Sequence, residues 1–283
     1  MKNVFLILIS LLVFSSCETV VDLTLSEGQK SLVSEAVLEF PDDSDYGNVR
    51  VFLTQTASFF SDAPNLPISG ANIVLNDTYL LDEHPDSMGY YTIGSIPKEI
   101  GAIYKLDIEA EISGVTGSWS GSDYLTQRAI VDSFYVVFKP GQGPFDKGGY
   151  HIHMAFDEPG DQVNFYHQKI EVSRNDTMPT YKQPDFVQIY DDELVNGQYL
   201  DFEINHNPFL LSDTVSVAFS SITEPTYLFY ENINQLLFET IGIGAAPPFP
   251  LRGNLISQND NFENSLGNFQ VKNIFEKVII IEE

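Results

Sequence analysis

The chain is short of cysteine, tryptophan and basic residues. In 283 residues it has one cysteine, one tryptophan and 14 lysines and arginines against 40 aspartates and glutamates, for a formal net charge of −26. A single cysteine excludes an internal disulfide, so stability has to come from packing. The charge argues against nucleic acid as a partner, because the chain would repel phosphate backbones. We interpret the spread of acidic residues as a charged, solvated surface.

Long apolar runs are also scarce. The segment 4–14 is apolar apart from Ser10, but its eleven residues rise only about 16 Å as a helix, against a hydrocarbon core of about 30 Å. Lys2 precedes it, and Ser15, Ser16 and Cys17 follow it. A positive charge, a short apolar stretch and small residues in this order are typical of a cleaved signal peptide. We therefore predict a leader over residues 1–16.

Cys17 stands directly after the expected cleavage site. We predict that it is lipidated and becomes the first residue of an exported lipoprotein, with residues 17–26 as a tether. A cysteine carrying more than one acyl chain would give a stable membrane anchor. The expected location is the outer membrane, lipid-anchored and at the cell surface. The alternative is an incidental buried thiol, which requires the match in position to be accidental.

Beyond residue 27 the dominant period is two. Short runs rich in β-branched and aromatic residues, such as Val49–Thr54, Ala71–Leu75 and Tyr104–Ala110, alternate with turn clusters of Gly, Pro, Asn and Asp. Regular short strands without long helices between them indicate an all-β protein built from sandwiches.

Two tandem β-sandwich domains of Ig-like or transthyretin-like type are predicted, over residues 27–126 and 127–283. The second opens with the apolar run Ile130–Phe138, which we expect to form a central strand buried on both faces. Further strands are expected at Tyr150–Phe156, Val163–Val172, Gln198–Ile204, Thr214–Ser220, Phe269–Val271 and Val278–Ile281.

One segment of the second domain has helical spacing. Thr223 or Glu224 can cap it, Pro225 suits the first turn, and apolar residues then recur every three or four positions. We predict a helix over 225–240. The loop that follows contains Pro247, Pro248, Phe249 and Pro250, and is a candidate contact region for a partner.

A pair of histidines is a candidate metal site. His151 and His153 are two apart on an expected strand, so both imidazoles would point to one face. His167 or Asp157 could supply a third ligand. The alternative is a pair of ordinary surface histidines.

Motifs for catalysis are incomplete. The segment Gly117–Gly121 resembles a nucleophile elbow, but Trp119 occupies the position of the nucleophile. Asp43–Asn48 begins like a calcium loop, yet its glycine is one place early. We predict no catalytic residues, no enzyme activity and no cofactor. A glycan-active enzyme would require a pair of carboxylates in a cleft.

Three hydroxyl residues lie in the pattern Asp, then Ser or Thr, then an apolar residue, on which the exported proteins of some bacteria are O-glycosylated. They are Ser87, Thr177 and Thr214. Modification of at least one is a hypothesis.

Several pieces of the chain resemble known families. Residues 67–75, 89–92 and 102–106 are similar to the sandwich of carboxypeptidase-regulatory and transthyretin-like domains. A longer series of segments follows one order along the chain: 17–18 with 20–23, 32–35, 67–75 with 89–91, 192–198, 224–229 and 264–269. In these segments, taken in this order, the chain as a whole resembles the Bacteroidota lipoproteins grouped as domain of unknown function 4249.

This resemblance implies a function at the cell envelope. It implies an accessory, non-catalytic role beside a TonB-dependent receptor in nutrient or ion uptake, with the ligand unidentified. A structural or adhesive envelope lipoprotein is the alternative.

Overall fold

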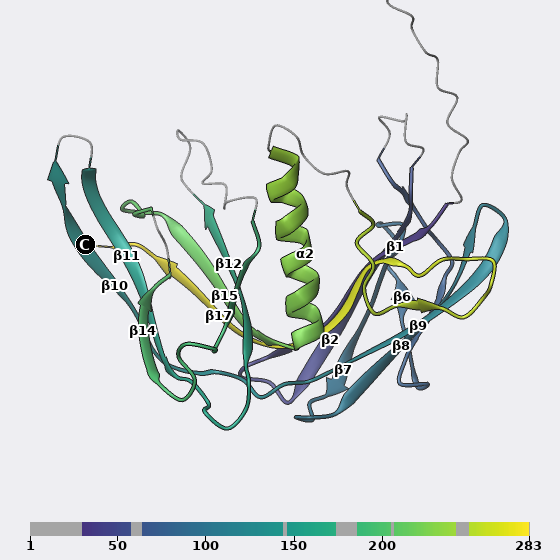
Figure 1. Ribbon diagram of the computed structural model, residues 1–283, viewed down its shortest axis with the longest axis horizontal. Coiled ribbons are helices and arrows are strands. Elements are labelled where there is room, and N and C mark those ends of the chain that lie inside the picture. Colours follow the sequence, from purple (N-terminus) through teal and green to yellow (C-terminus); the bar gives the residue numbers. More distant parts are fainter. Residues whose placement is uncertain are drawn as a thin grey trace, which may run out of the picture. The chain divides into compact units, whose positions relative to one another are not determined.

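The computed structural model describes residues 30–57, 64–143, 146–173, 186–204, 207–241 and 249–282 (Figure 1). The expected leader, Cys17, Thr177, Pro247 and Pro248 lie outside these ranges. In the described part the protein is all-β with one helix, α2 (Glu224–Ile241), so the predicted fold class is confirmed. The strands are β1 (Leu32–Pro41), β2 (Tyr46–Gln55), β3 (Leu66–Pro67), β4 (Asn72–Leu75), β5 (Tyr79–Leu80), β6 (Asp82–Glu83), β7 (Tyr90–Pro97), β8 (Ile103–Ile112), β9 (Val115–Tyr124), β10 (Ile130–Gly143), β11 (Asp146–Asp157), β12 (Phe165–Ser173), β13 (Gln188–Asp191), β14 (Tyr199–Glu203), β15 (Thr214–Ile222), β16 (Ile256–Ser257) and β17 (Leu266–Ile280).

The strands form three sheets. The largest has the order β13-β12-β15-β17-β1-β2-β7-β6, with β3 paired to β2. A five-stranded sheet has the order β16-β9-β8-β4-β5, and a three-stranded sheet the order β10-β11-β14. Strands β1 and β17 pair in parallel, with Val33 opposite Leu266 and Glu39 opposite Lys272. The large sheet thus joins strands from both sides of the expected boundary at residues 126 and 127.

One face of the large sheet is buried in two hydrophobic clusters. Alternation along β17 places Phe269 and Val271 in the cluster shared with the five-stranded sheet, which contains Trp119. Further along the same face, Phe275 and Ile279 pack against the cluster shared with the three-stranded sheet. A single strand therefore contributes to both cores.

Three of the predicted strands differ from the structure. Ile130–Phe138 is part of β10, an edge strand of the three-stranded sheet, and the prediction of a central strand is wrong. Phe134 and Val136 pack against the core, whereas Tyr135, which points to the other face, is 38% exposed. A continuous apolar run does not show whether a strand is covered on both faces, and here its outer face is open. The runs 269–271 and 278–281 belong to one long strand, β17, and its extension.

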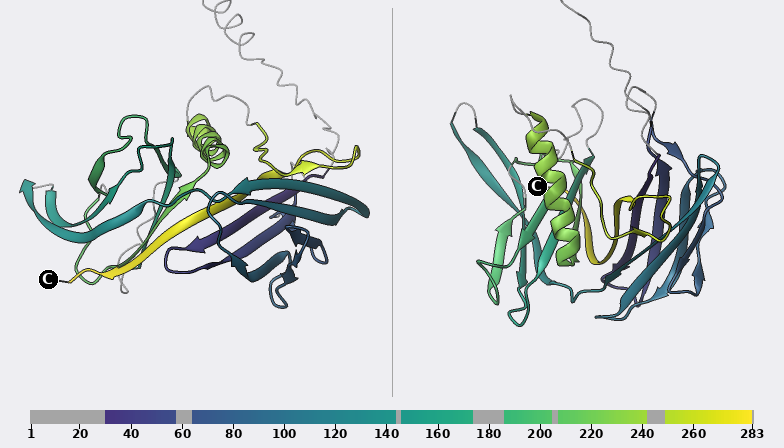
Figure 2. Two further views of the ribbon diagram at one scale, coloured as in Figure 1. Left: turned by 90° about the horizontal axis from the view of Figure 1, so that it is seen from below. Right: turned by 45° about the vertical axis from the view of Figure 1, so that its right-hand side comes forward.

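The predicted helix is confirmed as α2, and it packs against the large sheet (Figures 1 and 2). The Tyr227 ring lies 4.9 Å from that of Phe165 on β12. The side-chain amide of Asn234 accepts a hydrogen bond from the backbone N–H of Val187 and donates one to its carbonyl. In the described part of the chain, no helix has the length and apolar character needed to cross a membrane.

Candidate functional site

The face of the large sheet turned away from the two cores carries a trough. Residues 33, 35, 37 and 39 of β1 point to this face, as do residues 270, 272 and 274 of β17, because side chains alternate along a strand. An apolar hollow of about 760 Å³ and a polar hollow of about 560 Å³ lie along these strands. Arg50 of β2 lines both hollows, so they meet at its side chain.

The apolar half of the trough lies between the sheet and α2. Val33, Val37 and Phe52 line its floor, and the helix residues Phe229, Ile233 and Leu236 line its wall. Its volume is within the range of roughly 300–1,000 Å³ that is usual for small-molecule sites, which are also mostly apolar. The polar groups in this half include Glu35, Asn65, Asn268 and Gln270.

The polar half follows directly along the same two strands. Glu39 of β1 forms ion pairs with Arg50 and, at 3.2 Å, with Lys272 of β17. Burial lowers the pKa of Lys272, whose side chain is only 9% exposed, while the charge of Glu39 acts in the opposite direction. One carboxylate therefore faces two cations here.

Two further residues of the sheet complete this half. Lys169 of β12 pairs with Glu171 at 2.6 Å, and Glu276 of β17 also lines the hollow. The lining thus combines three cations with the carboxylates of Glu39 and Glu276.

A stacked pair of rings ties the helix to the floor of the trough. The ring of Tyr230 lies 4.9 Å from that of His167, with an interplanar angle of 26°. The Tyr230 hydroxyl donates a hydrogen bond of 2.8 Å to the side-chain carbonyl of Gln270. Burial, assisted by the charges of Lys272 and Lys169, lowers the pKa of His167 to about 3. His167 is therefore neutral at physiological pH and is part of the helix contact.

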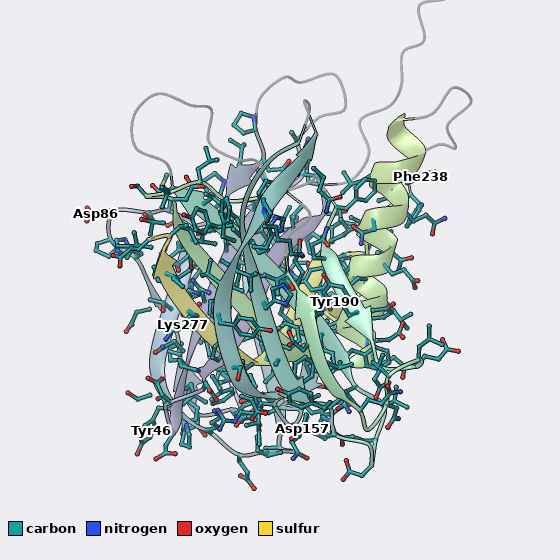
Figure 3. The ribbon with its side chains drawn as sticks, turned by 90° about the vertical axis from the view of Figure 1, so that its left-hand side faces the viewer. Tyr46, Asp86, Asp157, Tyr190, Phe238 and Lys277 are labelled. Carbon is teal, nitrogen blue, oxygen red and sulfur yellow. The ribbon has the colours of Figure 1, made fainter. Side chains whose placement is uncertain are left out.

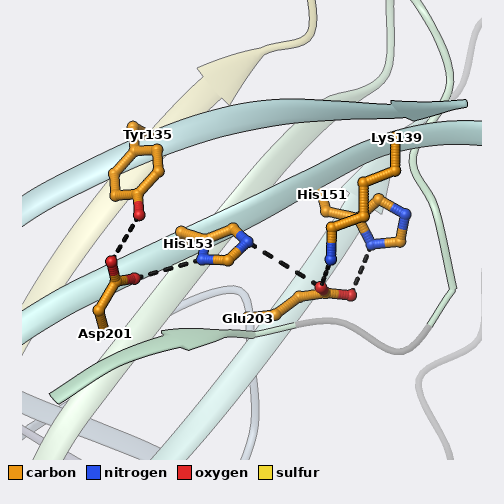
Figure 4. A network of polar contacts seen from close by, with 6 residues as sticks. All are labelled: Tyr135, Lys139, His151, His153, Asp201 and Glu203. Carbon is orange, nitrogen blue, oxygen red and sulfur yellow. Dashed lines mark hydrogen bonds and ion pairs between the residues drawn. The ribbon is translucent and has the colours of Figure 1, made fainter.

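The predicted histidine pair lies elsewhere, on the outer face of the three-stranded sheet (Figure 4). His151 Nδ1 is 2.5 Å from Glu203, and His153 Nδ1 is 3.2 Å from Asp201. The second nitrogen of His153, Nε2, lies 4.0 Å from Glu203. Tyr135 donates a hydrogen bond of 2.7 Å to Asp201 and stacks on the His153 ring.

The carboxylates of this network are held in their charged form. Burial acts to raise the pKa of Glu203, but hydrogen bonds from Lys139 and His151 outweigh it, so the pKa is lowered. The hydrogen bond from Tyr135 lowers the pKa of Asp201. Both imidazoles are thus engaged by carboxylates of the neighbouring strand β14.

The structure brings His151 and His153 to one face, but not the expected third ligand. His167 belongs to the large sheet, and Asp157 is four residues beyond His153, about 13 Å along the strand. Among the residues that the structure describes, no group of three or more His, Cys, Asp or Glu side chains is arranged to hold a metal ion. The geometry is that of two histidine–carboxylate pairs.

The other predicted site residues are dispersed. Phe249 and Pro250, from the predicted contact loop, line the apolar half of the trough. Ser87 is exposed beside Asp86 in the turn before β7 (Figure 3), and Thr214 is partly exposed at the start of β15.

Sequence reasoning missed the trough itself. One signal was available, since Val33, Glu35, Val37 and Glu39 alternate apolar and acidic residues on the side of β1 opposite the core. The partner strand β17 lies more than 220 residues away, and no local pattern indicates that pairing.

The chain matches one known protein family. No curated protein and no solved structure matches the chain significantly. Residues 18–277 match the family described as Domain of unknown function (DUF4249). That description names no catalytic activity. Because the match covers nearly the whole chain, the protein belongs to the DUF4249 family.

Proposed function

We propose that this protein is an outer-membrane-anchored accessory lipoprotein that holds a small ligand in the trough beside α2 and serves a TonB-dependent receptor in uptake. The observation that carries the proposal is the trough. It combines a mostly apolar hollow of about 760 Å³ with a charged hollow that meets it at Arg50.

The composition of the trough supports binding as its function. Aliphatic and aromatic side chains supply most of the apolar lining, and Arg50 and Lys272 are each paired with Glu39. Such a site retains a ligand by burying its apolar surface and positions it with a few charged groups.

Anchoring through Cys17 is the second part of the proposal, and the order of residues 1–17 supports it. The test is the distribution of the full chain among the outer-membrane, inner-membrane and soluble fractions of its host. We expect the unaltered chain in the outer membrane and the Cys17→Ala variant outside it. Equal distribution of the two would contradict anchoring at this residue.

Co-purification tests the proposed partnership with a receptor. The full chain is extracted from host membranes in mild detergent, and the accompanying membrane proteins are identified by mass spectrometry. We expect a TonB-dependent receptor to be enriched over a preparation from cells that lack the chain. Recovery without a receptor would contradict the uptake role and favour a structural or adhesive one.

A further inference from the structure

We propose that the ligand of the trough is an anionic amphiphile, with its hydrocarbon chain in the apolar half and its carboxylate or phosphate group beside Arg50 and Lys272. This inference rests on the proposed function, because it names the chemical class of ligand for the same site. Three features of the trough support it: the continuity of its two halves, the charge of the polar half, and the position of an acidic residue in the apolar half.

The continuity follows from the strands that form the floor. Along β1, Val33 and Val37 line the apolar hollow, and Glu39 lines the polar hollow two residues further on. Along β17, Gln270 and Lys272 make the same transition. Because β1 and β17 are paired in parallel, both transitions occur at the same level of the sheet. A ligand lying along the strands would contact both environments.

The charge of the polar half favours an anion. The chain has only 14 basic residues and a net charge of −26, yet three of them, Arg50, Lys169 and Lys272, line this one hollow, against the two carboxylates of Glu39 and Glu276. Glu39 faces both Arg50 and Lys272 with a single carboxylate. Lys272 is largely buried, where a charge is costly unless it is paired. Arg50 and Lys272 share one carboxylate, that of Glu39. An anionic group of the ligand would supply a second negative charge beside these two cations.

The acidic residue in the apolar half sets the orientation. Glu35 lines that hollow on the same face of β1 as Val37. A negatively charged head group would be repelled by Glu35 and attracted by Arg50. The hydrocarbon part would then lie against Phe52, Ile233 and Leu236, where each buried methylene adds about fourfold to the affinity.

Isothermal titration calorimetry with matched probes tests this inference. The full chain carrying Cys17→Ala lacks the proposed acylation site, and the probes are decanoate, hexanoate, decyl phosphate, decanol and decylamine below their micelle concentrations. We expect decanoate or decyl phosphate to bind at least about tenfold more tightly than decanol or decylamine. Hexanoate, with four fewer methylenes, should bind at least about 30-fold more weakly than decanoate.

Variants locate the two ends of the ligand. Arg50→Gln should weaken the anionic probes at least about tenfold and leave decanol unchanged. The matched control is Lys105→Gln, which removes another partly exposed cation, one that pairs with Asp107 at 2.8 Å outside the trough. Ile233→Asp should weaken every probe that binds.

Three results would overturn the inference: decanol or decylamine binding as tightly as the anions, Arg50→Gln behaving like Lys105→Gln, or no binding by any probe. A different observation tests the proposed function. It fails if chain extracted from its host carries no small molecule in the trough, whatever the probes show.

Discussion

The hydroxyl of Thr223 donates a hydrogen bond of 2.8 Å to the carboxylate of Asp123, which joins the start of α2 to strand β9. The same carboxylate accepts a 2.8 Å hydrogen bond from the backbone N–H of Val271 in β17. Asp123 is only 5% exposed. One buried side chain therefore connects the helical wall of the trough to the strand that forms its floor.

Replacing this carboxylate should destabilise the fold. Asp123→Ala leaves the Val271 N–H and the Thr223 hydroxyl without their acceptor, which we expect to cost about 2–4 kcal/mol in the free energy of unfolding. Urea denaturation measures this free energy. Unfolding is monitored by the fluorescence of Trp119, the single tryptophan, which is buried. The exposed Asp82→Ala is the control and should stay within about 0.5 kcal/mol. A loss for Asp123→Ala no larger than that of Asp82→Ala would refute the structural role.

Stability should depend on pH through His167. Its pKa in the folded protein, about 3, lies below the value of about 6.5 in the unfolded chain. The unfolded chain then binds the proton more tightly, so this contribution to stability is complete above pH 6.5 and is lost as the pH falls toward 3. His167→Phe keeps a ring for Tyr230 to stack on. It should reduce the change in the free energy of unfolding between pH 7 and pH 5.

The exposed His84→Gln provides the comparison, since His84 lies in the turn before β7. We expect it to retain the slope of the unaltered protein over the same pH range. An unchanged slope in His167→Phe would show that His167 does not carry the effect.

The parallel pairing of β1 and β17 leaves no room for a side chain at Gly267. Its φ is +97°, and an added Cβ would lie 2.0 Å from the carbonyl oxygen of Ser34 in β1. Gly267→Ala should therefore cost more than about 3 kcal/mol. Gly101 has a φ of +79°, and an added Cβ there would have no atom within 4 Å. Gly101→Ala should therefore lose only the free energy that corresponds to backbone strain, about 1–2 kcal/mol. Thermal unfolding of both variants measures the difference, and equal losses would exclude the steric explanation.

Local patterns in the sequence predicted the elements but not their assembly. Alternation revealed strands such as β2 and β8, and capping residues with helical spacing revealed α2, because these signals lie within a few residues. The shared face of His151 and His153 was predictable for the same reason, whereas their partners Glu203 and Asp201 are 52 and 48 residues away. The trough depends on the pairing of β1 with β17, the two ends of the described chain, and periodicity shows which residues share a face but not which strands become neighbours.

The proposed ligand of the trough beside α2 can be detected directly. Native mass spectrometry of the full chain extracted from its host's membranes tests for it most directly. Ile233→Asp places a charge in the apolar wall, and the control Phe238→Asp changes a residue of the same helix that is 72% exposed and points away from the sheet (Figure 3). We predict a bound small molecule on the unaltered chain and on Phe238→Asp, and its loss from Ile233→Asp. The same mass on all three proteins, or no bound molecule on any of them, would contradict the account.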